Sequence, residues 1–366
     1  MSSFDDQLSE LKANSLFRDC PLLDESGIQF SSNDYLGLSK HPQLLDTVKN
    51  AITKFGFGST GSRLLSGNHG LFAELEKKCA RLLGKPSALF FNSGYQANIG
   101  VISALLNKAD VVFADKFCHS SIINGISLSK AKLFRYKHLD YSHLDQLLTT
   151  HRKQFKNALI ISEGLFSMDG DFSDMKVLCQ LKQKHKSFLM MDDAHSIGLF
   201  EQGRGSSFDY AESVDLIIAP FGKALGSYGA AVGCSEEIRS YLINKAASFI
   251  YSTALPLPVI QFNIACLDLL PSLDKEREML WSNTEFFRNM LATLSLKVLG
   301  ESNIVPICFE RLEDTLNCSN KLEAAGTVAL PIRPPTVHPS NTRVRFSVCS
   351  WHTKSQLEAV CDVLRP

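Results

Sequence analysis

Short apolar runs alternate with helical stretches through residues 88–234, and this alternation constrains the fold more than any other feature of the chain. The runs are short and rich in β-branched side chains, and stretches with helical periodicity, about 10–15 residues long, separate most of them. Parallel strands need crossovers of that length, so the pattern predicts an α/β fold with a mostly parallel sheet covered on both faces. The predicted strands are 88–92, 111–115, 132–136, 158–163, 188–193, 215–219 and 230–234.

The pattern changes on both sides of this region. The N-terminal segment predicts an amphipathic helix followed by a turn-rich arm, and the strand–helix alternation ends near residue 268. A long charged helix at 273–294 then precedes short strands and further helices, which is an α+β pattern. The predicted parts are an N-terminal arm (1–35), a large domain with a seven-stranded sheet (36–268) and a smaller α+β C-terminal domain (269–366).

Composition argues against several classes of partner. The 38 basic and 38 acidic residues cancel, so we expect no nucleic-acid-binding face. The N-terminus is polar, and no apolar run reaches the roughly 18 residues of a membrane span, so we expect neither a signal peptide nor a membrane anchor. The ten cysteines contain no Cys-x-x-Cys pair and no zinc-type spacing. We therefore expect reduced thiols in the cytoplasm and no metal site.

Polar residues follow the predicted strands, where open α/β sheets bind their ligands. Ser93 and Gly94 follow the first strand and open a helix, which suits both a phosphate site and an ordinary capped turn. His119 follows the second strand, where a helix cap or a surface histidine is the common alternative to a ligand contact. The segment EGLFSMDGD (163–171) fits a polar loop equally well. None of these signals is specific when it is taken alone.

Two segments are less ordinary. Asp192, Asp193 and His195 directly follow the apolar run FLMM, where a buried carboxylate needs a cationic partner. Metal binding by these three residues is one interpretation, although the spacing is weak evidence for it, and helix capping is another. Lys223 stands in the glycine-rich segment APFGKALG, and Ile217 excludes a phosphate-binding loop because that motif requires glycine there.

A lysine among small residues is suited to act as an amine nucleophile, most commonly through a Schiff base. A phosphate cradle, a buried carboxylate, stacking histidines and such a lysine are together what pyridoxal 5'-phosphate (PLP) requires of a protein, because the carboxylate keeps the pyridine nitrogen protonated. The sequence therefore predicts a PLP site at the carboxyl ends of the strands.

Eight motifs, in order from about residue 15 to the C-terminus, resemble those of the α-oxoamine synthases, which are fold-type-I PLP enzymes. The resemblance implies the fold-type-I architecture and a PLP-dependent acyltransferase. The motifs are FSSNDYLGL (30–38), GSTGSRLLSGNHGLFAELE (58–76), NSGYQAN (92–98), EGLFSMDGD (163–171), DDAHSIGLFEQGRG (192–205), FGKALG (221–226), FIYSTALP (249–256) and IRPPTV (332–337).

The resemblance also implies roles for individual residues. Lys223 would carry the cofactor as a Schiff base and move the substrate Cα proton, and Asp192 would pair with the pyridinium nitrogen. His119 would stack on the ring, His195 would hydrogen-bond its 3-oxygen, and Ser167 would lie beside it.

Further residues would contact the phosphate and the substrates. The backbone of Gly94 and Tyr95 would hold the phosphate, and Thr253 would reach it from the other subunit of a homodimer. Arg333 would hold the amino-acid carboxylate, with Thr336 nearby. Arg18 lies where the family often has an arginine for the acyl substrate, although the surrounding motif matches poorly.

The implied reaction is a decarboxylative condensation of an amino acid with an acyl thioester. The segments SSNDYLGL and IRPPTV favour L-alanine and a pimeloyl thioester, a step of biotin synthesis, and leave coenzyme A and acyl carrier protein both open as the thiol. The alternatives are a glycine C-acetyltransferase or another family member that uses glycine and a short acyl-CoA, and a non-catalytic scaffold subunit, against which Lys223 argues.

Pro220 departs from the family pattern, which usually has threonine or serine three residues before the lysine. Proline offers neither a hydroxyl nor an N–H to the phosphate, so we expect weaker retention of the cofactor.

Overall fold

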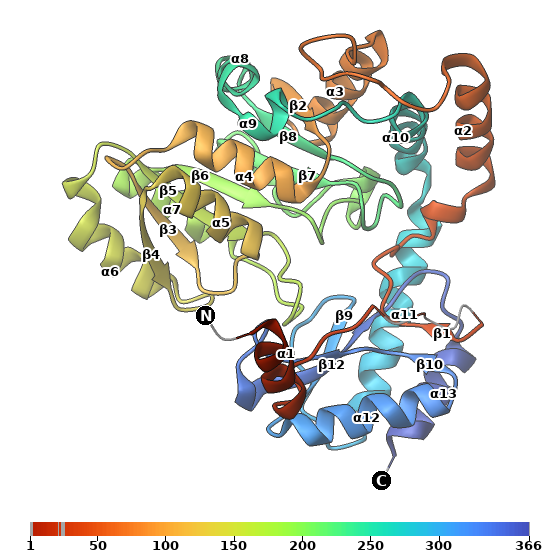
Figure 1. Ribbon diagram of the computed structural model, residues 1–366. Helices are drawn as coiled ribbons and strands as arrows, with labels where there is room; N and C mark the ends of the chain where they lie inside the picture. The colour runs from red at the N-terminus through yellow and green to blue at the C-terminus, as the bar shows by residue number, and fades with distance from the viewer. Residues whose placement is uncertain (1–2, 21, 23–25, 366) are drawn as a thin grey trace. The chain divides into compact units, whose positions relative to one another are not determined.

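The structure, a computed structural model, describes residues 3–20, 22 and 26–365 (Figure 1). The described chain divides into two compact units. The large unit comprises residues 33–167 and 171–280, and the C-terminal unit comprises residues 1–32, 168–170 and 281–366. The N-terminal arm is thus grouped with the C-terminal residues, and the division falls within the long helix α11 (Asp274–Ala292) rather than at residue 268.

The large unit is built on a seven-stranded sheet in the order β2-β8-β7-β6-β5-β3-β4. Neighbouring strands are parallel except for β8, which is antiparallel to both β2 and β7. This confirms the predicted α/β class and the mostly parallel sheet of seven strands. The strands are β2 (Ser87–Phe91), β3 (Val111–Asp115), β4 (Lys132–Tyr136), β5 (Ala158–Glu163), β6 (Phe188–Asp192), β7 (Leu216–Pro220) and β8 (Ala230–Cys234).

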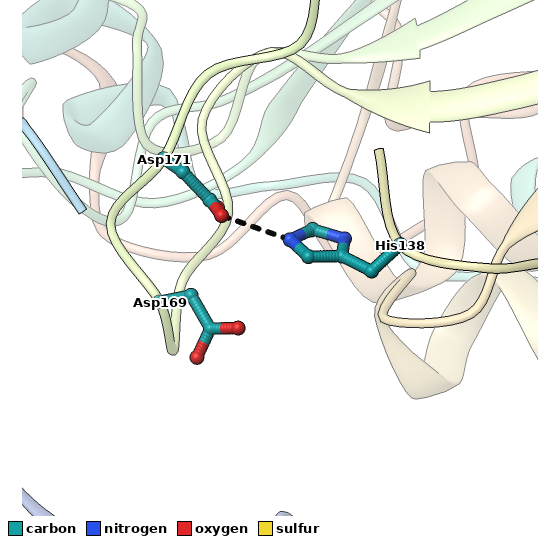
Figure 2. Close-up of side chains that lie close together, drawn as sticks. All are labelled: His138, Asp169 and Asp171. Atoms are coloured by element: carbon teal, nitrogen blue, oxygen red, sulfur yellow. Dashed lines mark hydrogen bonds and ion pairs between the residues drawn. The ribbon is translucent and has the colours of Figure 1, made fainter. Parts of the chain in front are cut away.

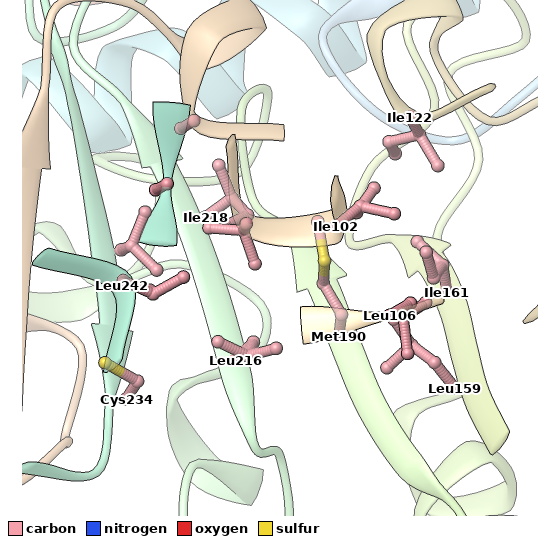
Figure 3. Packing of buried hydrophobic residues seen from close by; sticks show 14 of the residues in the cluster. Ile102, Leu106, Ile122, Leu159, Ile161, Met190, Leu216, Ile218, Cys234 and Leu242 are labelled. Atoms are coloured by element: carbon pink, nitrogen blue, oxygen red, sulfur yellow. The ribbon is translucent and has the colours of Figure 1, made fainter. Parts of the chain in front are cut away.

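Helices cover the sheet on both faces. Alternate strand residues such as Val112, Ile161 and Ile218 pack with α4, α5, α8 and α9 in one apolar cluster (Figure 3). The intervening residues, such as Phe113 and Ile217, are equally buried, because successive side chains of a strand point to opposite faces. The helices of the large unit are α2 (Pro42–Phe55), α3 (Gly70–Leu82), α4 (Gly94–Leu105), α5 (Ser120–Ser129), α6 (Tyr141–His151), α7 (Met175–His185), α8 (Glu236–Lys245), α9 (Ala247–Ile250) and α10 (Leu257–Leu269).

The C-terminal unit has its own core. Phe30 is fully buried there, and its ring lies 5.4 Å from that of Phe346 and 5.8 Å from that of Phe287. The pairing of β1 with β10 adds to this contact, which is why the arm belongs to this unit. The elements are α1 (Phe4–Ala13), β1 (Ile28–Gln29), β9 (Ile304–Phe309), α12 (Leu312–Ala324), β10 (Thr327–Val328), β11 (Pro331–Ile332), β12 (Thr342–Ser347) and α13 (Lys354–Leu364).

Two global properties bear on the sequence expectations. All ten cysteines are free thiols, and seven of them are buried. Among the described residues, none of the helices combines the length and the apolar character that crossing a membrane requires.

Candidate active site

A cavity of about 180 Å³ lies in the large unit at the carboxyl ends of its parallel strands. It contains the residues that the sequence placed there for the cofactor ring, together with several that the sequence did not single out. The lining residues are Gly94, Tyr95, Asn98, His119, Ser121, Glu163, Ser167, Asp192, Ala194, His195, Pro220 and Lys223.

The sheet register explains why these side chains meet. Glu163 ends β5 and Asp192 ends β6, and the two are direct partners across the strand pair. Lys223 follows the end of β7, and His119 follows the end of β3. Because parallel strands end at the same edge, residues more than a hundred positions apart converge on one cavity.

Asp192 is a fixed anion in this cavity. Its side chain is buried, with an exposed fraction of 4%. Its Oδ2 accepts a 2.8 Å hydrogen bond from Asn98 Nδ2, and its Oδ1 accepts one of 3.0 Å from the Ala194 N–H. Asn98 Nδ2 also lies 3.0 Å from Ser121 Oγ, so the amide joins β6 to α5. The carboxylate is therefore held in one orientation by two donors.

Glu163 is a second buried carboxyl beside the first. Its Oε1 accepts a 2.6 Å hydrogen bond from the His119 N–H. Burial, and next the neighbouring charge of Asp192, raise the pKa of Glu163 to about 8, although Lys223 acts in the opposite direction. Two adjacent carboxylates cannot both ionise cheaply, so Glu163 holds its proton near neutral pH.

The two histidines of the cavity are held by different means. Desolvation of its ring lowers the pKa of His119, with Asp192 opposing and Lys223 reinforcing the change. The neutral ring is oriented by Ser121, whose Oγ lies 2.8 Å from His119 Nδ1. His195 is buried, and Tyr35 Oη lies 2.7 Å from its Nδ1. Tyr35 comes from the motif FSSNDYLGL, so that motif supports the cavity through a histidine.

Lys223 lies on a tight turn and is half-buried rather than buried. Its carbonyl oxygen accepts a 2.8 Å hydrogen bond from the Gly226 N–H. Gly226 has a φ of +60°, and a Cβ at this position would lie 2.3 Å from the Ser39 N. Only glycine meets both demands, because the left-handed region and the close backbone approach each exclude a side chain. The glycines around Lys223 thus shape the turn that presents it.

The start of α4 forms the other end of the cavity. Ser93 caps this helix, and its Oγ accepts a 3.2 Å hydrogen bond from the Gln96 N–H. Any Cβ at Gly94 would lie 2.6 Å from Cγ of Pro220, so the proline ring rests against the glycine backbone. Asn98 Oδ1 is buried without a hydrogen-bond partner among the described residues. The N-terminus of α4 and the proline therefore share one wall of the cavity.

The other predicted site residues are not among the described lining residues of this cavity. Thr253 is outside the described cavity lining and is exposed, and its carbonyl oxygen accepts a 2.7 Å hydrogen bond from Asn92 Nδ2. Arg18, Arg333 and Thr336 belong to the C-terminal unit and lie close together there. Arg18 Nη2 donates to Thr336 Oγ1 at 3.0 Å, and Arg333 Nη2 donates to the carbonyl oxygen of Phe17 at 2.5 Å.

Sequence reasoning missed Asn98, Ser121, Glu163 and Tyr35. Asn98 stands four residues after Gly94, so a helix beginning at Gly94 places it on the same face. Glu163 ends a strand, as Asp192 does, and that position is the signal that could have found it. The contact between Tyr35 and His195 joins distant parts of the chain and left no local signal.

Comparisons with known proteins agree on one family. The model of the family "Aminotransferase class I and II" matches residues 25–364. The chain is 42% identical to the 8-amino-7-oxononanoate synthase of Geobacter sulfurreducens over 333 residues, which are 89% of this chain and 85% of that protein. It is 40% identical to the enzyme of the same name from Geobacter metallireducens over 372 residues, covering 97% and 95% of the two chains.

Solved structures are similar over nearly the whole chain. A serine palmitoyltransferase from S. paucimobilis, with a PLP–myriocin aldimine bound, superposes with a TM-score of 0.92 at 26% identity, covering 98% of this chain and 95% of that one. The 8-amino-7-oxononanoate synthase of Francisella tularensis superposes with a TM-score of 0.81 at 32% identity, covering 93% and 97%.

Proposed function

The chain belongs to the aminotransferase class I and II family, and from that premise we propose that it joins L-alanine to a pimeloyl thioester to give 8-amino-7-oxononanoate, carbon dioxide and the free thiol. The observation that carries this conclusion is the identity of about 40% over nearly the full length of enzymes with that activity. The resemblance to the α-oxoamine synthases, the fold-type-I architecture and PLP dependence are confirmed.

The cavity fits PLP. Its volume of about 180 Å³ is below the roughly 300–1,000 Å³ of sites for drug-sized ligands, as suits a small ring. Gly94 lets the backbone at the start of α4 lie directly against Pro220, a helix N-terminus suits a phosphate, and Asn98 Oδ1 is a buried acceptor that lacks a partner among the described residues. Asp192 offers a fixed anion on the same cavity. Bound there, PLP supplies an electron sink for the substrate Cα.

The cavity residues divide the work. Lys223 would attach the cofactor and move the Cα proton of alanine, and Asp192, whose carboxylate is held by two donors, would keep the ring nitrogen protonated. His119 would stack on the ring, and its lowered pKa favours the neutral imidazole there. His195, which Tyr35 contacts, would hydrogen-bond the 3-oxygen, and Ser167 would lie beside the ring. The backbone N–H groups of Gly94 and Tyr95 would hold the phosphate.

The substrate contacts rest on sequence alone. Arg333 would bind the alanine carboxylate through a bidentate contact, with Thr336 nearby and Arg18 toward the acyl chain. Thr253 would complete the phosphate site of a partner subunit, so the enzyme would be a homodimer. The free thiols support the proposed location in the cytoplasm, and coenzyme A and acyl carrier protein are both candidate thiols.

The first experiment compares amino-acid substrates on the PLP-loaded protein. L-Alanine, glycine and L-serine, the last included because of the likeness to serine palmitoyltransferase, are each incubated with pimeloyl-CoA, and products are read by mass spectrometry. We expect 8-amino-7-oxononanoate from L-alanine and loss of the product in Lys223→Ala. Products from glycine or serine but not from alanine would refute the proposal. No product and no visible cofactor absorbance would point to the scaffold alternative.

A further inference from the structure

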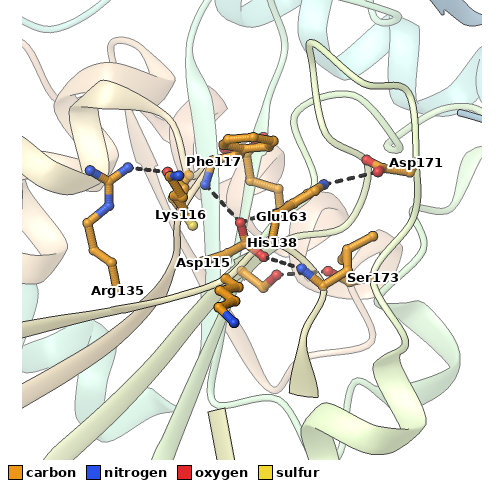
Figure 4. Close-up of polar contacts among 12 residues, drawn as sticks. Asp115, Lys116, Phe117, Arg135, His138, Glu163, Asp171 and Ser173 are labelled. Atoms are coloured by element: carbon orange, nitrogen blue, oxygen red, sulfur yellow. Dashed lines mark hydrogen bonds and ion pairs between the residues drawn. The ribbon is translucent and has the colours of Figure 1, made fainter. Parts of the chain in front are cut away.

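His138 connects two loops beside the cofactor cavity without lining it. It lies just beyond β4, and both nitrogens of its ring contact carboxylates of the large unit (Figures 2 and 4). Nδ1 lies 2.9 Å from Asp115 Oδ1, and Nε2 lies 3.0 Å from Asp171 Oδ2. Carboxylate oxygens only accept, and neutral imidazole donates from one nitrogen alone. Both contacts therefore require the imidazolium form.

The charged form is also the favoured one. Burial opposes the charge, but the hydrogen bonds of Asp115 and Asp171 outweigh it and raise the pKa of His138 to about 9. The His138 ring packs at 4.5 Å from the Phe166 ring, edge to face, and at 4.5 Å from the Phe117 ring. Two carboxylates and two aromatic rings thus enclose one cation.

The first carboxylate, that of Asp115, holds the chain segment that leads to His119. Asp115 is fully buried, and its Oδ1 also accepts a 2.8 Å hydrogen bond from the Phe117 N–H. Its Oδ2 accepts one of 3.0 Å from the Leu139 N–H. The short segment from Asp115 ends at His119, whose own N–H is taken by Glu163. His138 therefore fixes the start of the segment that carries the stacking ring.

The second carboxylate, that of Asp171, belongs to the loop that carries Ser167. The carbonyl oxygen of Asp171 accepts a 3.0 Å hydrogen bond from the Phe166 N–H, and an antiparallel bridge joins Leu165 to Phe172. These contacts close a loop, and Ser167 follows Phe166 directly in it and lines the cavity. His138 binds the side chain of Asp171 at the base of this loop.

We propose that His138, as a cation bound by Asp115 and Asp171, is a positioning residue that holds His119 and Ser167 against the cofactor. The inference rests on the proposed function only through PLP binding and not through the choice of substrate. Loss of the proton leaves one nitrogen facing a carboxylate lone pair, so one of the two loops is released.

Several other ionisable groups surround His138, Asp115 and Asp171. Glu163 lies on the adjoining strand end, and Lys116 and Arg135 lie on the outer side, where Arg135 Nη2 donates to the carbonyl oxygen of Lys116 (Figure 4). Tyr136 and Tyr141 are neutral below pH 10, because burial raises the pKa of each. Asp169, also drawn in Figure 2, belongs to the C-terminal unit and is ion-paired there with Arg343.

The test measures PLP affinity rather than turnover. Apo protein is titrated with PLP by equilibrium absorbance at several values between pH 7 and 10 for the wild type and His138→Gln. Outer partners of ligand-holding side chains are worth about 10–100-fold in affinity at metal sites, so we expect roughly tenfold weaker PLP binding in the variant at pH 7. The ratio of the two affinities should fall with a midpoint near pH 9 and approach 1 at and above pH 10, because the wild type then loses the same charge.

Two further variants make the result decisive. His185→Gln is the matched control, because it removes another histidine–carboxylate contact, in which His185 Nε2 lies 2.6 Å from Asp145 Oδ1. Neither residue is among the described lining residues of the cavity, so this variant should leave PLP affinity unchanged at every pH. Asp171→Asn keeps a hydrogen-bond acceptor for His138 but removes one negative charge, so the pKa of His138 should fall. The PLP affinity of this variant should therefore change with pH at a midpoint below 9. Thermal melting of each apo protein checks folding, and if His138→Gln does not fold, the Asp171→Asn midpoint alone decides.

Equal PLP affinity of folded His138→Gln and wild type at pH 7 would overturn the inference and leave the synthase proposal intact. So would a tenfold loss that is the same at pH 7 and pH 10, since a purely structural defect has no reason to vanish when the wild-type ring is neutral. Failure of the wild type to bind PLP would refute both proposals.

Discussion

Replacing Pro220 by threonine should strengthen cofactor binding. Threonine supplies a hydrogen-bond donor to the cofactor phosphate at a position where proline has none. Pro220 is the last residue of β7 and lines the cavity beside the start of α4. Its ring Cγ lies 2.6 Å from the position of a Cβ at Gly94, so a smaller side chain here opens space against the expected phosphate cradle. Threonine adds a hydroxyl there and a backbone N–H, neither of which proline has.

The magnitude follows from the kind of bond restored. A hydrogen bond to a charged group contributes about 1.5–3 kcal/mol. At roughly 1.4 kcal/mol per factor of ten, one such bond tightens the PLP dissociation constant by about 10- to 150-fold. The lower end is expected, because the proposed phosphate site would already offer the N–H groups of α4 as donors.

The assay is an equilibrium titration of apo protein with PLP at pH 7, followed by absorbance. Pro220→Ala is the matched control, because it removes the ring without adding a hydroxyl. Pro220→Thr should bind PLP at least tenfold more tightly than both the wild type and Pro220→Ala. Equal affinities of the two variants would refute the reasoning, since any gain would then come from removing the ring.

Three further predictions concern the same cavity. Gly94→Ala should lower the free energy of unfolding of the apo protein by about 1–3 kcal/mol through its contact with the Pro220 ring, and Gly94→Ala/Pro220→Ala should recover most of that loss in calorimetry. Independent, additive effects in this double mutant would show that the contact is not the cause. Glu163→Gln replaces the carboxyl group by a neutral amide and so mimics the protonated acid. The pKa of Glu163 is about 8 in the folded protein and lower in the unfolded chain, so the free energy of unfolding of the wild type falls as the pH rises through 8. Apo Glu163→Gln should therefore match the wild type near pH 5 and exceed it by a few kcal/mol at pH 9, as measured by denaturant titration, and identical pH profiles would contradict this. Tyr35→Phe removes the 2.7 Å contact with buried His195 and should cost roughly 1–3 kcal/mol of apo stability and slow turnover, whereas unchanged melting would argue against that support.

Much of the cofactor site was determined by the sequence alone. Strand periodicity located β3, β6 and β7, and so the strand ends at or after which His119, Asp192 and Lys223 lie, because side-chain alternation and helix length are local properties of the chain. The glycine-rich segment around Lys223 singled out this lysine, and the structure shows that Gly226 shapes its turn through a positive φ and a close backbone approach.

Only the tertiary structure decided which of these residues meet and what supports them. The pairing of Glu163 with Asp192 depends on the β5–β6 register, and the support of His195 by Tyr35 joins residues far apart in the chain. The N-terminal arm joined the C-terminal unit because Phe30 packs in that unit's core, a contact that no local pattern encodes. His138 gave no signal in the sequence, because its charge depends on two carboxylates that only the folded sheet edge brings to it. Local features such as strands, helices and turns follow from the order of neighbouring residues, whereas the pKa values and partners of buried groups arise from contacts between distant segments.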